Sequence, residues 1–384
     1  MSDTKQSNDS NSRVTELIYQ LFDVVKEEKK FIAIISLLFL VAGLVYPYTS
    51  VAMWFGFILA AYSAVSNDSI QTIGTFIASN AERKWYVLWL YIGGIFLATV
   101  AVGWYLNDGD VTYGRLQATD KNGDMAFPQP ESFAFLQIAA PIFLLILTRL
   151  RMPVSTTFLL LSSFAVSSGA VGSVITKSIN AYFLAFGLGL VVWLGISQLT
   201  KRYFTGKPSS VWVVAQWLTS GTLWSVWIMQ DAANIAIYLP RQLSLAQFLG
   251  FASVVFLGLG LIFFMRGDKI QQIVNEKSEV RDIRSATIID FVYALILVYK
   301  LTISVIPMST TWVFIGLLGG RELGIRIREK DHERKQTTKK GRITEALQMI
   351  GRDLGLAIVG LLVSVIIATS VNPDFREQIL KLFE

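Results

Sequence analysis

Two polar motifs interrupt the apolar stretches of this 384-residue chain, and each of them occurs twice. One motif places an amide side chain directly before an aspartate and a second amide three residues after it. The other places a serine and two threonines shortly after a proline. In chain order the residues are Asn67, Asp68 and Gln71; Ser155, Thr156 and Thr157; Gln230, Asp231 and Asn234; and Ser309, Thr310 and Thr311.

The aspartate motif offers only carboxylate and amide oxygens, which are the ligands that hard cations prefer. A carboxylate at the centre of a membrane helix costs on the order of 2.5–3.5 kcal/mol on insertion scales. We therefore expect both aspartates to face protein or water and to have a cationic partner. The motif predicts a site for Na⁺, or a proton on the carboxylate itself, at Asn67, Asp68, Gln230 and Asp231, with Gln71 and Asn234 as additional candidates.

The serine–threonine motif offers hydroxyl donors at an expected helix start. A proline is well placed in the opening turn of a helix, as at Pro153 and Pro307. Unsatisfied N–H groups and the positive end of the helix dipole favour an anion at that position. Two such helix starts near the middle of the membrane would surround a tetrahedral oxyanion with the hydroxyls of Ser155, Thr156, Thr157, Ser309, Thr310 and Thr311.

Either motif taken alone is usually a helix cap. Here the second copy of each motif follows the first by about 155–165 residues, in the same order, and this spacing predicts a duplicated unit. Paired polar breaks at corresponding positions of two halves are typical of transporter binding sites. The repetition therefore favours a binding site over capping alone.

The composition indicates a membrane protein that is all-α. Hydrophobic residues make up 53% of the chain and charged residues 16%, against about 25% charged residues in soluble domains. The chain has no cysteine and a single histidine, His332, so it lacks a thiolate metal site and a histidine pair for catalysis. Apolar runs predict about 10–12 membrane segments, and they cover residues 31–47, 50–65, 85–105, 133–150, 158–172, 181–199, 211–229, 244–265, 286–306, 312–319 and 353–371.

The charged residues predict how the chain is oriented and divided. Basic residues concentrate in 321–343, which is expected to be a cytoplasmic loop, whereas the acid-rich stretch 107–131 is expected to be external. Arg149 and Arg151 are expected at the cytoplasmic boundary. The predicted units are an amphipathic cytoplasmic segment (1–30), an added first helix (31–48), a first repeat (49–205), a second repeat (206–371) and a C-terminal tail (372–384).

Lys300 is a charged residue within the apolar run 286–306, with Asp290 near the start of that run. One interpretation is that Lys300 extends toward the interface or pairs with an acid inside the bundle. The other is that it supplies positive charge to the path of an anion. The sequence leaves both interpretations open.

Residues 50–371 resemble the PiT-type inorganic phosphate transporters. That family carries a Gly-Ala-Asn-Asp-Val-Ala-Asn type motif and a Pro-Val-Ser-Thr-Thr-His type motif in each half. The four motifs above are similar to them, with differences. Phe158 and Trp312 stand where the family has histidine, and Gln230 stands where it has asparagine. The glycine that opens each aspartate motif is Val65 or Ile228 here, and the glycine that ends the second is Ile237.

The resemblance implies two inverted repeats with broken helices and re-entrant hairpins. It implies a symporter that moves inorganic phosphate by alternating access, with Na⁺ or H⁺ as the coupling ion and no other cofactor, often as a homodimer. The bulky replacements leave sulfate or another small oxyanion open as the substrate, and a non-transporting sensor or scaffold remains an alternative. A multi-pass protein of the plasma membrane, such as a bacterial inner membrane, is expected. Membrane lipid is then a partner, and neither nucleic-acid binding nor enzymatic activity is predicted.

Overall fold

The computed structural model describes residues 28–119, 123, 125–150, 152–265, 282–329 and 339–380. Residues 1–27 of the predicted amphipathic segment, Arg151 and the centre of the basic segment lie outside these ranges. Within them, the regular structure is helical, apart from one isolated bridge between Thr119 and Met125. The prediction of an all-α protein is confirmed for the described residues.

The described residues form a succession of helices that differ widely in length. Residues 28–45 are helical. The elements that follow are α2 (Thr49–Thr72), α3 (Gly74–Ser79), α4 (Trp85–Leu106), η1 (Arg115–Gln117), α5 (Phe135–Arg149), α6 (Thr156–Leu159), η2 (Leu161–Phe164), α7 (Ser168–Tyr203), α8 (Ser210–Ala236), α9 (Leu245–Met265), α11 (Ile283–Ile303), α12 (Thr310–Arg328), α13 (Lys339–Val371) and α14 (Pro373–Leu380).

Six of the described helices are long and apolar enough to cross a membrane, namely α2, α4, α7, α9, α11 and α13. The chain is therefore a multi-pass membrane protein. The sequence predicted about 10–12 segments, and part of the difference lies in α5, which is apolar but has 15 residues. Another part lies in α8, which is 27 residues long and buries polar side chains that lower its mean hydropathy: Gln216, Ser220, Gln230, Asp231 and Asn234.

The expected apolar segment 158–172 is not one helix, because serine side chains divide it. Ser163 donates a hydrogen bond from its hydroxyl to the Leu160 carbonyl, 2.6 Å away, in the short 3₁₀ turn η2. Ser167 then caps α7 by accepting from the Ala170 N–H at 3.2 Å. Serine hydroxyls compete in this way with helical hydrogen bonds and favour breaks and caps. The last part of the expected segment thus belongs to the 36-residue helix α7.

The basic segment 321–343, predicted as a loop, is helical at both of its ends. Helix α12 continues to Arg328 and α13 begins at Lys339. Glu322 and Arg326 form an ion pair of 2.7 Å one turn apart, which favours a helix. The predicted boundary at residue 205 falls in the connection between α7 and α8, and the division into two repeats stays a prediction.

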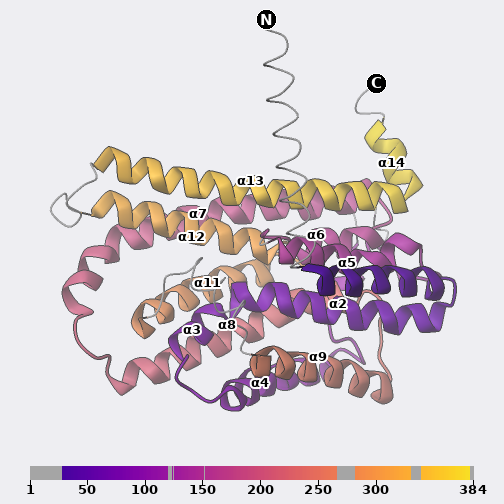
Figure 1. Ribbon diagram of the computed structural model, residues 1–384, viewed down its shortest axis with the longest axis horizontal. Coiled ribbons are helices and arrows are strands. Elements are labelled where there is room, and N and C mark those ends of the chain that lie inside the picture. Colours follow the sequence, from indigo (N-terminus) through magenta and orange to yellow (C-terminus); the bar gives the residue numbers. More distant parts are fainter. Residues whose placement is uncertain are drawn as a thin grey trace, which may run out of the picture.

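The long helices run side by side along the length of the molecule (Figure 1). Helix α7 packs against α12, which also packs against α13. Helix α2 lies against α5, α4 lies against α9, and α8 packs against α11. Helices α8 and α2 are in contact as well, so the two helices that carry the aspartate motifs meet.

Glycines allow α7 and α12 to approach closely. Gly316, Gly320 and Gly324 follow one another at four-residue spacing along α12. A Cβ atom on Gly320 would collide with the backbone carbonyl of Phe186, and one on Gly324 would lie 3.1 Å from the carbonyl of Leu190. Small residues at this spacing let membrane helices pack backbone to backbone. This packing fixes the start of α12, where the second hydroxyl motif lies.

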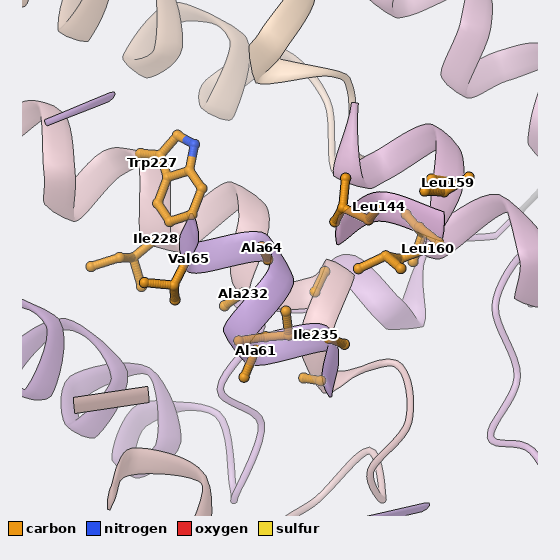
Figure 2. Close-up of a cluster of buried hydrophobic side chains, with 14 of the residues drawn as sticks. Ala61, Ala64, Val65, Leu144, Leu159, Leu160, Trp227, Ile228, Ala232 and Ile235 are labelled. Atoms are coloured by element: carbon orange, nitrogen blue, oxygen red, sulfur yellow. The ribbon is translucent and has the colours of Figure 1, made fainter. Parts of the chain in front are cut away.

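Apolar packing also holds α2 against α8 just before the two aspartates (Figure 2). Alanines dominate the α2 side and leave room for the aromatic and branched residues of α8. Val65 and Ile228 stand three residues before the aspartates, on the same helical faces. The labelled side chains come from α2, α5, α6, α8 and the turn after α6: Ala61, Ala64, Val65, Leu144, Leu159, Leu160, Trp227, Ile228, Ala232 and Ile235.

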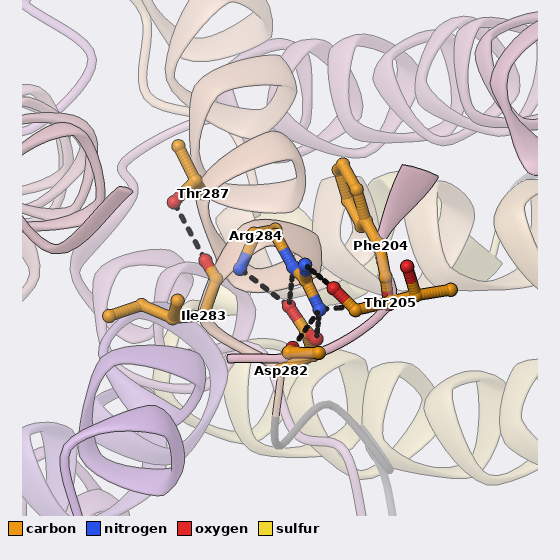
Figure 3. A network of polar contacts seen from close by, with 7 residues as sticks. Phe204, Thr205, Asp282, Ile283, Arg284 and Thr287 are labelled. Atoms are coloured by element: carbon orange, nitrogen blue, oxygen red, sulfur yellow. Dashed lines mark hydrogen bonds and ion pairs between the residues drawn. The ribbon is translucent and has the colours of Figure 1, made fainter. Parts of the chain in front are cut away.

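A buried arginine joins the start of α11 to the connection between α7 and α8 (Figure 3). Asp282 caps α11 by accepting from the Arg284 N–H at 2.8 Å and pairs with the Arg284 guanidinium at 2.6 Å. The same guanidinium donates to the carbonyls of Phe204 at 2.9 Å and Thr205 at 3.3 Å. The side-chain hydrogen bond from Arg284 lowers the pKa of Asp282 below its ordinary value, so the cap stays charged near neutral pH.

Gly320→Ala is expected to destabilise the protein, because the added methyl group collides with the backbone of α7. Overpacking of this kind costs about 1–3 kcal/mol. Gly187→Ala, on α7, is the matched control, because a Cβ atom there meets nothing within 4 Å. Thermal unfolding of both purified variants in detergent checks the prediction. Equal melting temperatures for the two variants would contradict the proposed close contact.

Candidate functional site

The two aspartates lie near the ends of α2 and α8 and are almost fully buried. Asp68 is 1% exposed and Asp231 is 3% exposed. They are close enough for their charges to interact. Two neighbouring carboxylates in a membrane interior repel one another and need cations, protons or hydrogen-bond donors to remain there.

Asp231 receives hydrogen bonds from three separate elements. Thr310, at the start of α12, donates its hydroxyl at 2.5 Å. Asn234, one turn further along α8, donates its side-chain N–H at 2.7 Å, and the hydroxyl of Thr157 on α6 lies at 3.4 Å. Asn234 also donates to the hydroxyls of Thr156 and Thr157, at 3.0 and 3.1 Å. The second aspartate motif therefore lies between the two hydroxyl motifs.

Each hydroxyl motif also donates a hydrogen bond to the backbone of the other. Thr157 shares its one hydroxyl hydrogen between Asp231 and the carbonyl of Met308, which lies at 3.3 Å, and Thr311 donates to the carbonyl of Val154 at 3.2 Å. Val154 and Met308 hold the same position, directly after the proline of their motif. The contacts are thus reciprocal, and they join α6 and α12 at their N-terminal ends.

The first aspartate motif makes a related but different set of contacts. Asn67 donates to Asp68 at 2.6 Å and to the carbonyl of Val154 at 2.8 Å. Thr156 lies beside Asp68. Gln230, the counterpart of Asn67, instead donates to the carbonyl of Leu297 on α11 at 3.0 Å. Its longer side chain reaches a different helix, so this replacement gives the two copies different surroundings.

The two serines act as N-caps. Ser155 accepts from the Phe158 N–H at 3.1 Å, and Ser309 accepts from the Trp312 N–H at 3.2 Å. Among the described hydrogen bonds neither hydroxyl donates, so each retains a hydrogen for another acceptor. The sequence predicted two comparable helix starts. The structure differs, because α12 has 19 residues whereas α6 is a single turn of four, too short for a substantial dipole.

Two oxygens of the aspartate motifs have no hydrogen-bond partner in the described part of the chain, although both are buried. They are Oδ2 of Asp68 and Oδ1 of Asn234. An unsatisfied buried acceptor costs about 1–3 kcal/mol, so native proteins rarely leave one without a role. Carboxylate and amide oxygens are hard ligands. Both oxygens are thus of the kind that coordinates Na⁺, and the cation site stays a prediction.

Two candidates from the sequence lie away from this cluster. Gln71 lines a separate cavity of about 130 Å³, together with Pro153 and Arg321. Lys300 lies on α11, and an ion pair with Asp290, one of the interpretations that the sequence left open, is not among the described ion pairs. Asp290 accepts instead from the hydroxyls of Thr75 and Ser220, both at 2.5 Å.

Arg115 is a buried residue that the sequence placed in an external loop. It is 3% exposed. Its Nε donates to the carbonyl of Met229 at 2.8 Å, and its Nη1 donates to the carbonyls of Ser304 and Val305 at 3.3 and 3.1 Å. Burial lowers the pKa of Arg115 to about 10, with Asp231 acting in the opposite direction, so the guanidinium stays charged at neutral pH.

No pattern in the sequence pointed to Arg115, because its partners are backbone carbonyls more than 100 residues away. The loop folds inward through tight turns. Asp108 and Tyr113 adopt positive φ, and Asp110 accepts from the N–H groups of Thr112 at 2.6 Å and Gly114 at 2.8 Å. The side of the membrane on which the loop lies stays a prediction.

The two aromatic residues that follow the hydroxyl motifs are in contact. The rings of Phe158 and Trp312 meet edge to face, with centroids 5.6 Å apart. Both side chains are buried. The indole Nε1 of Trp312 has no hydrogen-bond partner in the described part of the chain. The replacements thus form an aromatic contact between the motifs and leave one buried N–H donor.

Comparisons with known proteins agree with this architecture. No family model matches the sequence, and no curated protein matches it either. A solved structure described as the sodium-dependent phosphate transporter matches 83% of this chain and 98% of its own, with a TM-score of 0.51 and 18% sequence identity. The chain shares the fold of that transporter. The resemblance inferred from the motifs is thus confirmed at the level of fold.

Trp312→Phe removes an unsatisfied buried donor worth about 1–3 kcal/mol, but it also replaces the indole by a smaller ring, so its two effects on stability without anion oppose one another. If the indole N–H donates to a bound anion, the stabilisation by added phosphate falls in the same variant. Thermal unfolding with and without phosphate measures both effects. If added phosphate stabilises the variant as much as the unmodified protein, the indole N–H does not donate to the anion.

Proposed function

We propose that this chain is a secondary active transporter that moves inorganic phosphate across the membrane together with a coupling cation. The observation that carries the proposal is the single buried cluster in which two carboxylates meet both hydroxyl motifs. The fold shared with a sodium-dependent phosphate transporter supports it. No nucleophile–base pair is recognised among the described site residues, and a transport role accounts for them better than catalysis does.

Na⁺ is the proposed coupling ion, with H⁺ on a carboxylate as the alternative. Asp68 and Asn234 each have a buried oxygen without a partner, and Asn67 and Gln230 add further amide groups nearby. A cation here would offset the repulsion between Asp68 and Asp231. Among the described residues no cluster of three or more His, Cys, Asp or Glu side chains is present, and hard oxygen ligands suit Na⁺ better than a transition metal.

Phosphate is the proposed cargo because the hydroxyl motifs can donate hydrogen bonds to an oxyanion. Ser155 and Ser309 each keep a hydroxyl hydrogen, and the start of α12 supplies the positive end of a 19-residue helix. Sulfate has the same tetrahedral shape and stays the second candidate. Two points favour phosphate over sulfate. The solved structure with the same fold is described as a phosphate transporter, and phosphate retains an acid proton that can donate a hydrogen bond to a carboxylate-rich site.

The reciprocal contacts between the motifs support the proposal of two inverted repeats. Thr157 with Met308 and Thr311 with Val154 are the pairs that a two-fold relation between halves would generate. Alternating access would then move one half against the other around this cluster. A homodimer in the plasma membrane is part of the same proposal.

Uptake of radiolabelled phosphate into proteoliposomes tests the proposal. An inward Na⁺ gradient is expected to drive accumulation, and excess sulfate is expected to compete weakly. Asp68→Asn and Asp231→Asn each remove one carboxylate charge from the cation site, so Na⁺-driven uptake is expected to fall at least about tenfold. The rate as a function of Na⁺ concentration measures the loss of cation dependence, and a proton gradient replaces Na⁺ in a parallel arm.

Asp108→Asn is the matched control for charge removal. Asp108 is exposed and has a φ of 50°, a conformation that asparagine also adopts readily. This variant is expected to transport like the unmodified protein. Normal Na⁺-driven uptake by both site variants would overturn the cation assignment, and no uptake of phosphate under either gradient would overturn the proposed function.

Ser309→Gly separates anion binding from helix capping. Replacing an N-cap serine by alanine costs about 0.5–2 kcal/mol of stability, whereas glycine costs only a few tenths. Both substitutions remove the hydroxyl donor. Ser309→Gly is therefore expected to keep nearly normal thermal stability while raising the KM for phosphate about tenfold. A KM that rises only in Ser309→Ala would show that the serine acts as a cap.

A further inference from the structure

A second, basic cavity lies next to the second hydroxyl motif. Its volume is about 120 Å³. Gln230 and Met308 belong both to its lining and to the motifs, so the cavity borders the buried cluster directly. Three of its lining residues are basic, namely Arg115, Lys177 and Lys300, and none of those described is acidic.

The three basic residues come from separate parts of the chain and converge on the break between α11 and α12. Lys177, on α7, donates from Nζ to the hydroxyl of Ser304 at 2.6 Å. Arg115 is fixed by hydrogen bonds to the carbonyls of Ser304 and Val305. Lys177 lies within electrostatic range of both Arg115 and Lys300. The residues that follow the break lead directly to Ser309.

Such a cluster is costly without an anion. Like charges repel, so three basic side chains around one cavity favour an anion beside them. Asp231 lies within electrostatic range of Arg115. It already accepts from Thr310 and Asn234, and it lies in the cluster rather than in the lining of the cavity. Among the described residues, the lining of the cavity thus carries three basic side chains and no acidic one.

We propose that this cavity is a second binding site for a small tetrahedral oxyanion, held by Lys177, Lys300 and the guanidinium of Arg115. A buried water needs about 10–15 Å³ of such volume, so about 120 Å³ has room for an oxyanion with water. Lysine provides a mobile point charge suited to phosphate or sulfate. In a phosphate transporter this cavity would hold the anion before it enters the central cluster, and that role rests on the proposed function. Anion binding in the cavity does not.

The proposal predicts phosphate binding that does not require Na⁺, because the positive charges are side chains. Equilibrium binding of radiolabelled phosphate is measured with the full-length protein in detergent, in a choline buffer free of Na⁺, at low and at 150 mM ionic strength. Lys177→Met and Lys300→Met remove one charge each and retain an apolar stem. Each is expected to weaken this binding about tenfold, and higher salt is expected to weaken it in the unmodified protein.

Two further variants control the experiment. Lys207→Met changes an exposed lysine in the connection between α7 and α8 and is expected to bind normally. Lys177→Arg retains the charge and is expected to restore most of the binding. Competition by sulfate and by glycerol 3-phosphate distinguishes a free oxyanion from the phosphate of a lipid headgroup. Stronger competition by glycerol 3-phosphate than by sulfate would reassign the site to lipid and overturn the proposal.

The outcome for this cavity can be separated from the outcome for transport. If the unmodified protein shows no Na⁺-independent binding, or if Lys177→Met and Lys300→Met bind as it does, the cavity is not an anion site, even where Na⁺-driven uptake is intact. If binding is lost in these variants but no phosphate uptake occurs, the site stands and the proposed function fails. In a transporting protein, both variants are expected to raise the KM for phosphate with little change in kcat.

Discussion

A lipid bilayer offers no hydrogen bonds, so each polar group inside it must find its partner in the protein. In this chain the requirement falls most heavily on Asp68 and Asp231, which are buried close together. Asp231 takes its donors from α8, α12 and the turn α6. Moving α12 or α6 away from α8 would take a donor from a buried carboxylate, at a cost of about 1–3 kcal/mol. The relative position of the three is therefore set by hydrogen bonds at the centre, and the apolar contacts around them maintain it.

The composition and length of the surrounding helices are consistent with this constraint. Helix α12 starts inside the protein at Ser309, so its first turns must pass close to α7, and glycines at four-residue spacing make that possible. Helix α7 has 36 residues, or about 54 Å at 1.5 Å per residue, which exceeds the roughly 30 Å of a bilayer core. It therefore lies tilted or extends beyond the bilayer, and along its length it supports both Lys177 and the start of α12.

The sequence predicted the helical class and the residues of the central cluster, because paired motifs at matching spacing are a local pattern. It did not predict how the segment around the first hydroxyl motif divides, since capping by Ser167 competes with apolar character that favours a helix. It could not place Arg115 or Lys177, because their neighbours are distant in the sequence and several are backbone atoms. Patterns report which side chains are unusual for a membrane, whereas three-dimensional packing decides which of them meet. The chemical roles of the cluster residues stay predictions.

The proposed transport also needs a physical reason for the cation and the anion to move together, and the charges suggest one. A phosphate ion near Thr310 would meet two carboxylates, and in a medium of low dielectric constant that repulsion is far stronger than in water. A cation at Asp68 removes much of it, so cation binding raises the affinity for the anion, and by linkage the anion raises the affinity for the cation by the same factor. The basic cavity beside Gln230 would hold an anion at low cost before the cation arrives. Coupling then requires no direct contact between the two ions during the approach, only that the basic cavity borders the cluster of carboxylates, as it does through Gln230 and Met308.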